Sequence, residues 1–193
     1  MFDLEQFKSE CRLAASGVAP QEQIREILAR AVESPGTLLK TLGEPERAGI
    51  QALYRSTELT ILNVIWGPQM IIMPHNHNMW AMIGIYTGRE DNILWKRLHH
   101  STDGRIEAAA AKALSERETL PLGKDIIHSV ANPLHRLTGA IHIYGGDFFA
   151  VPRSEWDAER LTEQAGNVEK LLSLFEDSNR LYEAKRSPTT LRS

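Results

Sequence analysis

The stretch "WGPQMIIMPHNHNMWAMIGIYTG" (residues 66–88) decides the fold. It places two of the chain's seven histidines one residue apart, at His75 and His77, between two apolar segments. Side chains at alternate positions of a β-strand leave from the same face, so the two imidazoles can converge on one point. That geometry suits a metal ion and also suits a buried polar pair, so the rest of the chain has to distinguish the two interpretations.

Length, composition and charge limit the classes of protein to consider. The 193 residues are 42% apolar and 24% charged, which is ordinary for one soluble globular domain. The formal net charge is −3, so no basic excess attracts the chain to nucleic acid or to an anionic membrane. We therefore expect neither nucleic acid nor a membrane as a partner.

The single cysteine and the first residues bear on the cellular compartment. Cys11 has no second cysteine to pair with, so no intramolecular disulfide can form, as is usual in a reducing compartment. The amino-terminal residues lack the continuous apolar core of a signal peptide, and no apolar run approaches the roughly 18 residues of a membrane helix. We expect a cytoplasmic protein.

We predict one domain over residues 1–193, in which three parts differ in their pattern of apolar and polar residues. Residues 2–48 carry apolar side chains three and four apart, which predicts helices. Residues 57–151 consist of short apolar or β-branched runs between turn residues, which predicts strands. Within this part, the alanine-rich segment 105–116 allows either a helix or a strand pair. Residues 154–186 return to helical periodicity and predict C-terminal helices.

The strand-rich part predicts a mainly β architecture. Many short strands separated by turns are typical of a closed barrel or a two-sheet sandwich, with the terminal helices packed outside. The mouth or interior of such a barrel is where side chains from different strands meet around a small ligand or a metal ion. The strongest strand candidates are "LTILNVIW", "AMIGIYTG", "NILWKRL", "DIIHSV" and "GAIHIYG".

Two further histidines lie on predicted strands. His128 belongs to "DIIHSV", and His142 belongs to "GAIHIYG" with Tyr144 on the same strand face. Two imidazoles from one strand and a third from another form a three-ligand site that leaves coordination positions open. We predict that His75, His77 and His128 are the metal ligands. The remaining histidines lie in turn-like segments and are expected in exposed loops: His99, His100 and His135.

The spacing of these residues resembles the two sequence motifs of the cupin superfamily. The matching elements are "G-x(7)-H-x-H" from Gly67 to His77 and on to Gly88, "P-x-G" at 121–123, and "H-x(3)-N" from His128 to Asn132. The resemblance implies a double-stranded β-helix, or jelly-roll, barrel with flanking N- and C-terminal helices. The chain departs from the commonest cupin pattern at Ala81 and Met82, where that pattern has a glutamate as fourth ligand.

The missing glutamate indicates a particular kind of metal chemistry. Three neutral imidazoles leave the full charge of a divalent ion and several open positions, which attract an anionic chelating substrate and leave room for oxygen. In this the chain resembles the thiol dioxygenases, the family of cysteine dioxygenase and 3-mercaptopropionate dioxygenase. It looks still more like a set of uncharacterised bacterial cupins beside that family.

The resemblance extends to a pair of residues near the end of the barrel. The thiol dioxygenases carry a Ser-x-His-x-Tyr sequence, and this chain matches its histidine and tyrosine with His142 and Tyr144, while Ala140 replaces the serine. The family resemblance implies that Tyr144 supplies a catalytic hydroxyl and that His142 orients it. A buried structural tyrosine remains the alternative.

Candidates for substrate recognition are Arg55 and Arg153. An arginine fork suits a carboxylate, and the cysteine-specific branch of the family has one before the first metal motif, where this chain has Tyr54 and Arg55. The mercaptopropionate-type branch has an arginine about nine residues past the tyrosine, a spacing that Arg153 reproduces. A surface role for Arg153 is the alternative. Trp80 could line the pocket or belong to the core.

The resulting functional prediction is a non-haem iron enzyme. We expect Fe(II) as cofactor and an oxidoreductase, a dioxygenase that uses O2 to convert a small thiol of the cysteine or 3-mercaptopropionate type to its sulfinic acid. Zn, Ni or Mn are alternative metals. Two other functions stay open: a cupin metalloenzyme of different chemistry, such as an isomerase, hydrolase or carbon-oxidising dioxygenase, and a non-catalytic ligand-binding cupin. Pairing of barrel edges into a homodimer also stays open.

Overall fold

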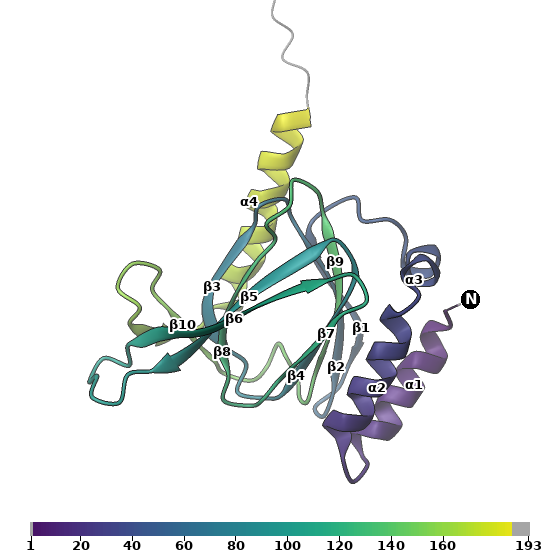
Figure 1. Ribbon diagram of the computed structural model, residues 1–193, viewed down its shortest axis with the longest axis horizontal. Coiled ribbons are helices and arrows are strands. Elements are labelled where there is room, and N and C mark those ends of the chain that lie inside the picture. Colours follow the sequence, from purple (N-terminus) through teal and green to yellow (C-terminus); the bar gives the residue numbers. More distant parts are fainter. Residues whose placement is uncertain (1, 187–193) are drawn as a thin grey trace, which may run out of the picture.

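The computed structural model describes residues 2–186 (Figure 1). The predicted N-terminal helices are present as three: α1 (Leu4–Ala15), α2 (Pro20–Val32) and α3 (Pro35–Leu42). In the described part of the chain, none of the helices has both the length and the apolar character needed to cross a membrane. The strands and the last helix are β1 (Gly49–Arg55), β2 (Thr60–Trp66), β3 (Ile71–Asn76), β4 (Ala81–Thr87), β5 (Arg89–Arg97), β6 (Ile106–Ser115), β7 (Thr119–Leu122), β8 (Ile127–Ala131), β9 (Thr138–Tyr144), β10 (Ser154–Trp156), β11 (Glu163–Ala165) and α4 (Val168–Arg186).

The strand order confirms the predicted jelly-roll barrel. One antiparallel sheet has the order β1-β2-β9-β4-β7, and the other has the order β11-β10-β3-β8-β5-β6. The chain therefore crosses between the two sheets from β2 to β3, from β3 to β4 and from β4 to β5, and again on its way back through β7, β8 and β9. This alternation is the double-stranded β-helix, in which the two sheets face each other across one interior.

The sheet that contains β2, β4 and β9 is buried on both faces. Its inward side chains, such as Leu62 and Ile83, belong to the barrel core. Its outward side chains, such as Met82 and Ile143, pack under the N-terminal helices, which cover this side of the barrel (Figure 1). A strand covered on both faces has no polar face, which explains why these strands are continuous apolar runs in the sequence.

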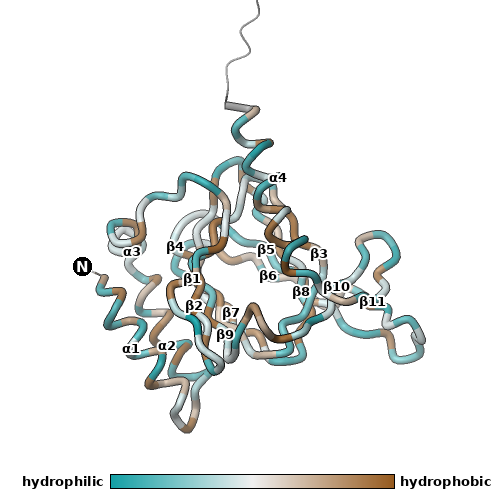
Figure 2. The backbone as a smooth tube through the Cα atoms, turned by 180° about the vertical axis from the view of Figure 1, so that it is seen from behind, coloured by the Kyte–Doolittle hydropathy of each residue, from teal (hydrophilic) through white to brown (hydrophobic). Residues whose placement is uncertain are grey.

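Helix α4 is fixed to the barrel through its second half. Phe175 stacks on Trp66 with 5.4 Å between ring centroids, and the Asn179 amide makes hydrogen bonds of 2.8 and 3.0 Å to the backbone of Ala48. A Cβ on Gly67 would lie 1.8 Å from the Ser178 hydroxyl oxygen, so this glycine allows the close approach of the helix. The first half of α4 therefore lies over the side of the barrel that carries β3 (Figure 2).

The structure differs from the sequence prediction in one segment, and in another it decides between two predicted alternatives. Helix α4 begins only at Val168, because the preceding residues form the short strands β10 and β11, and β10 carries the fully buried Trp156. The prediction of helix from residue 154 is therefore wrong. The alanine-rich segment is strand β6, because its backbone pairs along β5. Strand β1 was missed, since its pattern of half-buried residues gives no clear alternation.

Candidate metal centre

Three histidine side chains meet inside the barrel. His75 and His128 are directly paired across β3 and β8, and their ring centroids are 4.6 Å apart. His77 follows the end of β3, and its ring lies 5.0 Å from that of His75 and 4.9 Å from that of His128. One ligand nitrogen from each residue lies within 4.8 Å of the other two. The structure thus brings together the three predicted ligands, although His77 lies beyond the strand.

Hydrogen bonds fix which nitrogen each ring presents. The Nδ1 atom of His75 donates to the Met73 carbonyl at 2.9 Å, and that of His128 donates to the Asn92 amide oxygen at 2.7 Å. Their unprotonated Nε2 atoms are thus free, and Nε2 of His128 lies 3.3 Å from Nε2 of His77. Nitrogens bound to one metal at about 2.0–2.1 Å lie about 3–3.5 Å apart, so this pair has the required spacing. The residues fit a divalent metal ion, and the three imidazoles could hold one.

The electrostatic surroundings favour the ligand form of these imidazoles. Burial lowers the pKa of His75 from 6.5 to about 4, and the nearby Arg153 adds to that effect. Burial also lowers the pKa of His77 and of His128 well below the usual value, and neighbouring histidines contribute in both cases. All three rings are therefore neutral at pH 7, as a metal ligand has to be.

The stability of the metal-free protein should depend on pH through these histidines. An unfolded histidine takes up a proton below about pH 6.5, whereas folded His75 takes it up only near pH 4. In that interval the unfolded state binds more protons, so the free energy of unfolding should fall as the pH is lowered from 6.5 to 4. Above pH 6.5 this contribution is constant. Urea unfolding of chelator-treated protein at a series of pH values measures the effect, and a flat profile over this interval would contradict it.

Tyr144 and His142 lie beside the three histidines, as predicted. The Tyr144 hydroxyl lies 3.0 Å from Nδ1 of His142, and its ring meets the edge of the His77 ring at 5.0 Å between centroids. Both side chains come from β9 and are buried at 3% exposure. Burial raises the pKa of Tyr144, so its hydroxyl keeps its proton at pH 7.

Arg153 is a half-buried cation that has no anionic partner among residues 2–186. Its Nε and Nη2 atoms are buried and have no hydrogen-bond partner, and its guanidinium lies 4.0 Å from the centroid of the Phe148 ring. Burial lowers the pKa of Arg153, but a guanidinium remains charged in proteins. The nearby Glu155 carboxylate already pairs with Lys170 and accepts from Gln164. A buried charge of this kind calls for an anion that the described residues do not supply.

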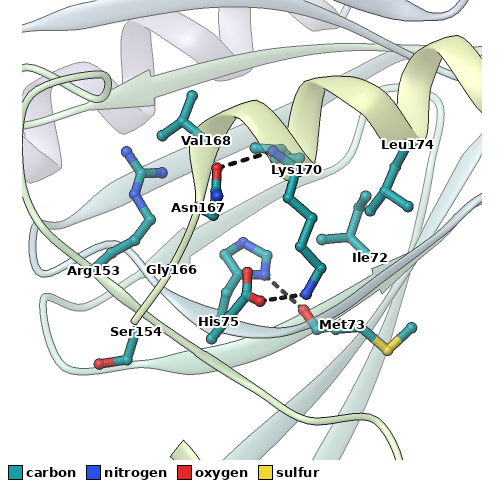
Figure 3. A pocket seen from close by; sticks show the side chains of 12 residues that line it. Ile72, Met73, His75, Arg153, Ser154, Gly166, Asn167, Val168, Lys170 and Leu174 are labelled. Atoms are coloured by element: carbon teal, nitrogen blue, oxygen red, sulfur yellow. Dashed lines mark hydrogen bonds and ion pairs between the residues drawn. The ribbon is translucent and has the colours of Figure 1, made fainter. Parts of the chain in front are cut away.

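A small cavity is lined by both Arg153 and His75, one of the three candidate metal ligands. It has a volume of about 50 Å³ and lies between β3, β10 and the first turns of α4 (Figure 3). Arg153 and His75 both line it, together with apolar side chains that include Ile72 and Leu174. A molecule with one anionic group and a few further atoms fits this space. The cavity therefore places the guanidinium of Arg153 next to one ligand of the candidate metal site.

The other predicted substrate residues have different roles. Arg55 makes two hydrogen bonds of 2.9 and 3.0 Å to Asp147, and its side chain is 50% exposed, so a surface ion pair already occupies its guanidinium. Tyr54 and Trp80 pack in the apolar layer beneath the N-terminal helices. None of these three residues lines the cavity of Arg153 and His75, and their contact with substrate stays a prediction. His99, His100 and His135 are exposed, as predicted.

Two buried polar residues behind the site were missed in the sequence. Glu90 is 0% exposed and Asn92 is 1% exposed, and both belong to β5. Asn92 binds His128, and Glu90 binds Asn92 at 2.9 Å and His142 at 3.3 Å. The available signal was the spacing of two polar residues at alternate positions of a strand, which directs both to the same face.

Comparison with known proteins found partial similarity to several solved structures. No protein-family model matches the chain. An RmlC-like cupin from Methanocaldococcus jannaschii is similar over 55% of this chain and 87% of its own, with 9% identity and a TM-score of 0.45. A variant of oxalate decarboxylase from Bacillus subtilis is similar over 56% of this chain and 28% of its own, with 15% identity and a TM-score of 0.41. A structure of DMSP lyases is similar over 51% of this chain and 44% of its own, with 15% identity and a TM-score of 0.39. These values carry no argument about metal, substrate or reaction.

Proposed function

We propose that the protein is a non-haem Fe(II)-dependent thiol dioxygenase that converts a small thiol of the cysteine or 3-mercaptopropionate type to its sulfinic acid. The observation that carries the proposal is the pair of buried Arg153 nitrogens, Nε and Nη2, which have no hydrogen-bond partner among residues 2–186, at the same small cavity as His75. Three neutral imidazoles without a carboxylate ligand leave the charge of a divalent ion uncompensated. A substrate with two anionic groups, a thiolate and a carboxylate, matches these two positive centres.

Arg153 binds the carboxylate end of the substrate in this proposal. Its planar fork offers two parallel N–H donors, which suit the two oxygens of a carboxylate. The ring of Phe148 supports the guanidinium from one side, and a Cβ on Gly166 would lie 2.7 Å from Cγ of Arg153, so its side chain is held closely. The thiol end then points toward the three histidines. The chain thereby orients the sulfur before any bond is formed.

Tyr144 serves the reacting end of the substrate. Its ring lies against the ring of His77, and the hydrogen bond to His142 fixes the direction of its hydroxyl. Bound Fe(II) would supply the open coordination positions and the redox chemistry that bring thiolate and oxygen together. Both oxygen atoms end on sulfur, and sulfur provides the electrons that reduce oxygen, so the reaction needs no external reductant.

Oxygen uptake by anaerobically iron-loaded protein tests the proposal. Cysteine, cysteamine and 3-mercaptopropionate are offered separately, and mass spectrometry follows the addition of two oxygen atoms to each thiol. We expect stoichiometric uptake with a thiol that carries a carboxylate and little with cysteamine, which has none for Arg153 to bind. Iron-loaded protein that leaves all three thiols unoxidised would refute this function.

Replacement of Tyr144 by phenylalanine should slow turnover and keep the metal. The substitution removes only the hydroxyl, so the three imidazoles still bind iron, while the oriented donor is lost. We expect kcat to fall by about a hundredfold, the low end of the effect of a positioned proton donor. Steady-state oxygen uptake, normalised to iron content, gives the value.

Tyr86→Phe is the matched control for this variant. Tyr86 is also fully buried, but its hydroxyl donates to Asn63 at 2.8 Å in the layer under the N-terminal helices. Its loss should leave kcat unchanged. Equal rates for Tyr144→Phe and wild type would remove the hydroxyl from the mechanism.

A cupin metalloenzyme of different chemistry is the second candidate. The observation that favours it is Ala140, which stands where the thiol dioxygenases have a serine. The metal that the protein prefers distinguishes the two candidates, because non-redox isomerases and hydrolases work with Zn, Ni or Mn. Metal analysis of protein produced in medium containing all four metals gives the preference.

A further inference from the structure

A fully buried carboxylate, that of Glu90, lies behind the metal centre. It accepts hydrogen bonds from side chains of three strands: Trp66 on β2, Asn92 on β5 and His142 on β9. Within residues 2–186, His142 is the only basic side chain with a nitrogen within 4.0 Å of this carboxylate. A carboxylate that is removed from water in this way needs each of these donors.

The two carboxylate oxygens have different neighbours. Oε2 lies 2.7 Å from the indole nitrogen of Trp66, and an indole N–H can only donate. Oε1 lies 2.9 Å from the amide nitrogen of Asn92. An amide nitrogen can only donate, so the NH2 group of Asn92 donates to Oε1 of Glu90. The amide oxygen of Asn92 therefore faces the other way, toward His128.

The direction of the Asn92 amide decides which nitrogen of His128 is protonated. Its oxygen lies 2.7 Å from Nδ1 of His128 and can only accept, so the proton sits on Nδ1. The lone pair is then on Nε2, the atom 3.3 Å from Nε2 of His77. A reversed amide would offer NH2 to Nδ1, move the ring proton to Nε2, and block the nitrogen that faces the metal position.

We propose that Glu90 is a positioning residue of the metal centre, which sets the tautomer of the ligand His128 by fixing the direction of the Asn92 amide. Glu90 itself touches neither the metal position nor the substrate cavity. The inference rests on the metal centre of the proposed function and is independent of which reaction the metal supports.

Glu90→Gln tests this role with almost no change of shape. The glutamine at position 90 places its amide oxygen toward Trp66, because the indole N–H can only donate. The NH2 group of this glutamine therefore takes the place of Oε1. Two NH2 groups would then oppose each other, and the Asn92 amide turns over. We expect His128 to switch to the Nε2-protonated tautomer and the affinity for Co(II) to fall about tenfold to a hundredfold.

Two measurements on metal-free protein follow the change. Long-range proton–nitrogen NMR correlations of the histidine rings report the tautomer of His128 directly. Titration with Co(II), monitored by its visible absorption, gives the affinity without any catalytic turnover. Failure of the thiol oxidation assay therefore leaves this test intact, and the two proposals can fail separately.

A compensating substitution separates positioning from a general structural role. In the double variant Glu90→Gln/Asn92→Asp, a carboxylate at position 92 accepts both from the new amide and from Nδ1 of His128. The tautomer and the Co(II) affinity should return to the wild-type values. Asp91→Asn is the matched control, because Asp91 is the next residue of β5 and pairs outward with Arg89. It should change neither quantity.

The outcomes divide as follows. A tautomer switch and weaker Co(II) binding in Glu90→Gln, both reversed in the double variant, support the proposal. An unchanged tautomer and affinity in folded Glu90→Gln would overturn it, and so would a loss of affinity that the double variant fails to restore. If Glu90→Gln does not fold, the double variant alone decides, since wild-type affinity supports the proposal and weak binding contradicts it.

Discussion

His128→Ala should abolish stable metal binding and, with it, oxygen uptake. The substitution removes one of only three ligands, and the remaining pair leaves a divalent ion with two protein nitrogens. Loss of a residue that merely orients a ligand costs about tenfold to a hundredfold in metal affinity, so loss of the ligand itself should exceed about a hundredfold. Iron content after desalting and Co(II) titration both measure the effect.

His135→Ala is the matched control for this experiment. His135 is an exposed histidine only seven positions along the chain, and its loss should leave metal content and turnover at wild-type levels. Circular dichroism establishes that both variants are folded. An iron-replete and fully active His128→Ala protein would exclude the three-histidine centre as the site of the metal.

Arg153→Met should reduce kcat/KM by about a hundredfold to a thousandfold while the protein keeps or gains stability. The value of kcat/KM should fall because the carboxylate of the substrate would enter the cavity without a partner. Removal of one member of a buried charge pair costs about 2–5 kcal/mol. Stability should be kept or gained because, in the protein without substrate, Arg153 is a partly desolvated charge that has no salt bridge among residues 2–186. Such opposite effects are typical of a residue kept for function.

Arg55→Gln is the control, because Arg55 is the other arginine that the sequence nominates and it is already paired with Asp147. Loss of an exposed ion pair changes stability by about 0–1 kcal/mol, and we expect no change in kcat/KM. Steady-state kinetics and urea unfolding of both variants give the two quantities. A larger kinetic effect in Arg55→Gln than in Arg153→Met would reverse the assignment of the carboxylate site.

Much of the centre could be predicted because its signals are local. The histidines at 75, 77 and 128 stand within or beside short apolar runs, and strand alternation alone places His142 and Tyr144 on one face. The choice between the two arginines was not local. Arg55 is neutralised by a residue 92 positions away, and nothing near either arginine in the sequence distinguishes the paired one from the free one.

The sequence by itself determined the N-terminal helices and the strand-rich part that follows them, because hydrophobic periodicity is a property of neighbouring residues. The resemblance of its histidine motifs to those of the cupins implied the jelly-roll barrel and nominated the three candidate metal ligands. Only the tertiary structure decided the start of α4 at Val168, the unpaired state of Arg153 and the buried path from Glu90 through Asn92 to His128. These features depend on which donors, acceptors and charges of distant strands come within hydrogen-bond distance. Burial then makes each remaining polar group either satisfied or available to a ligand.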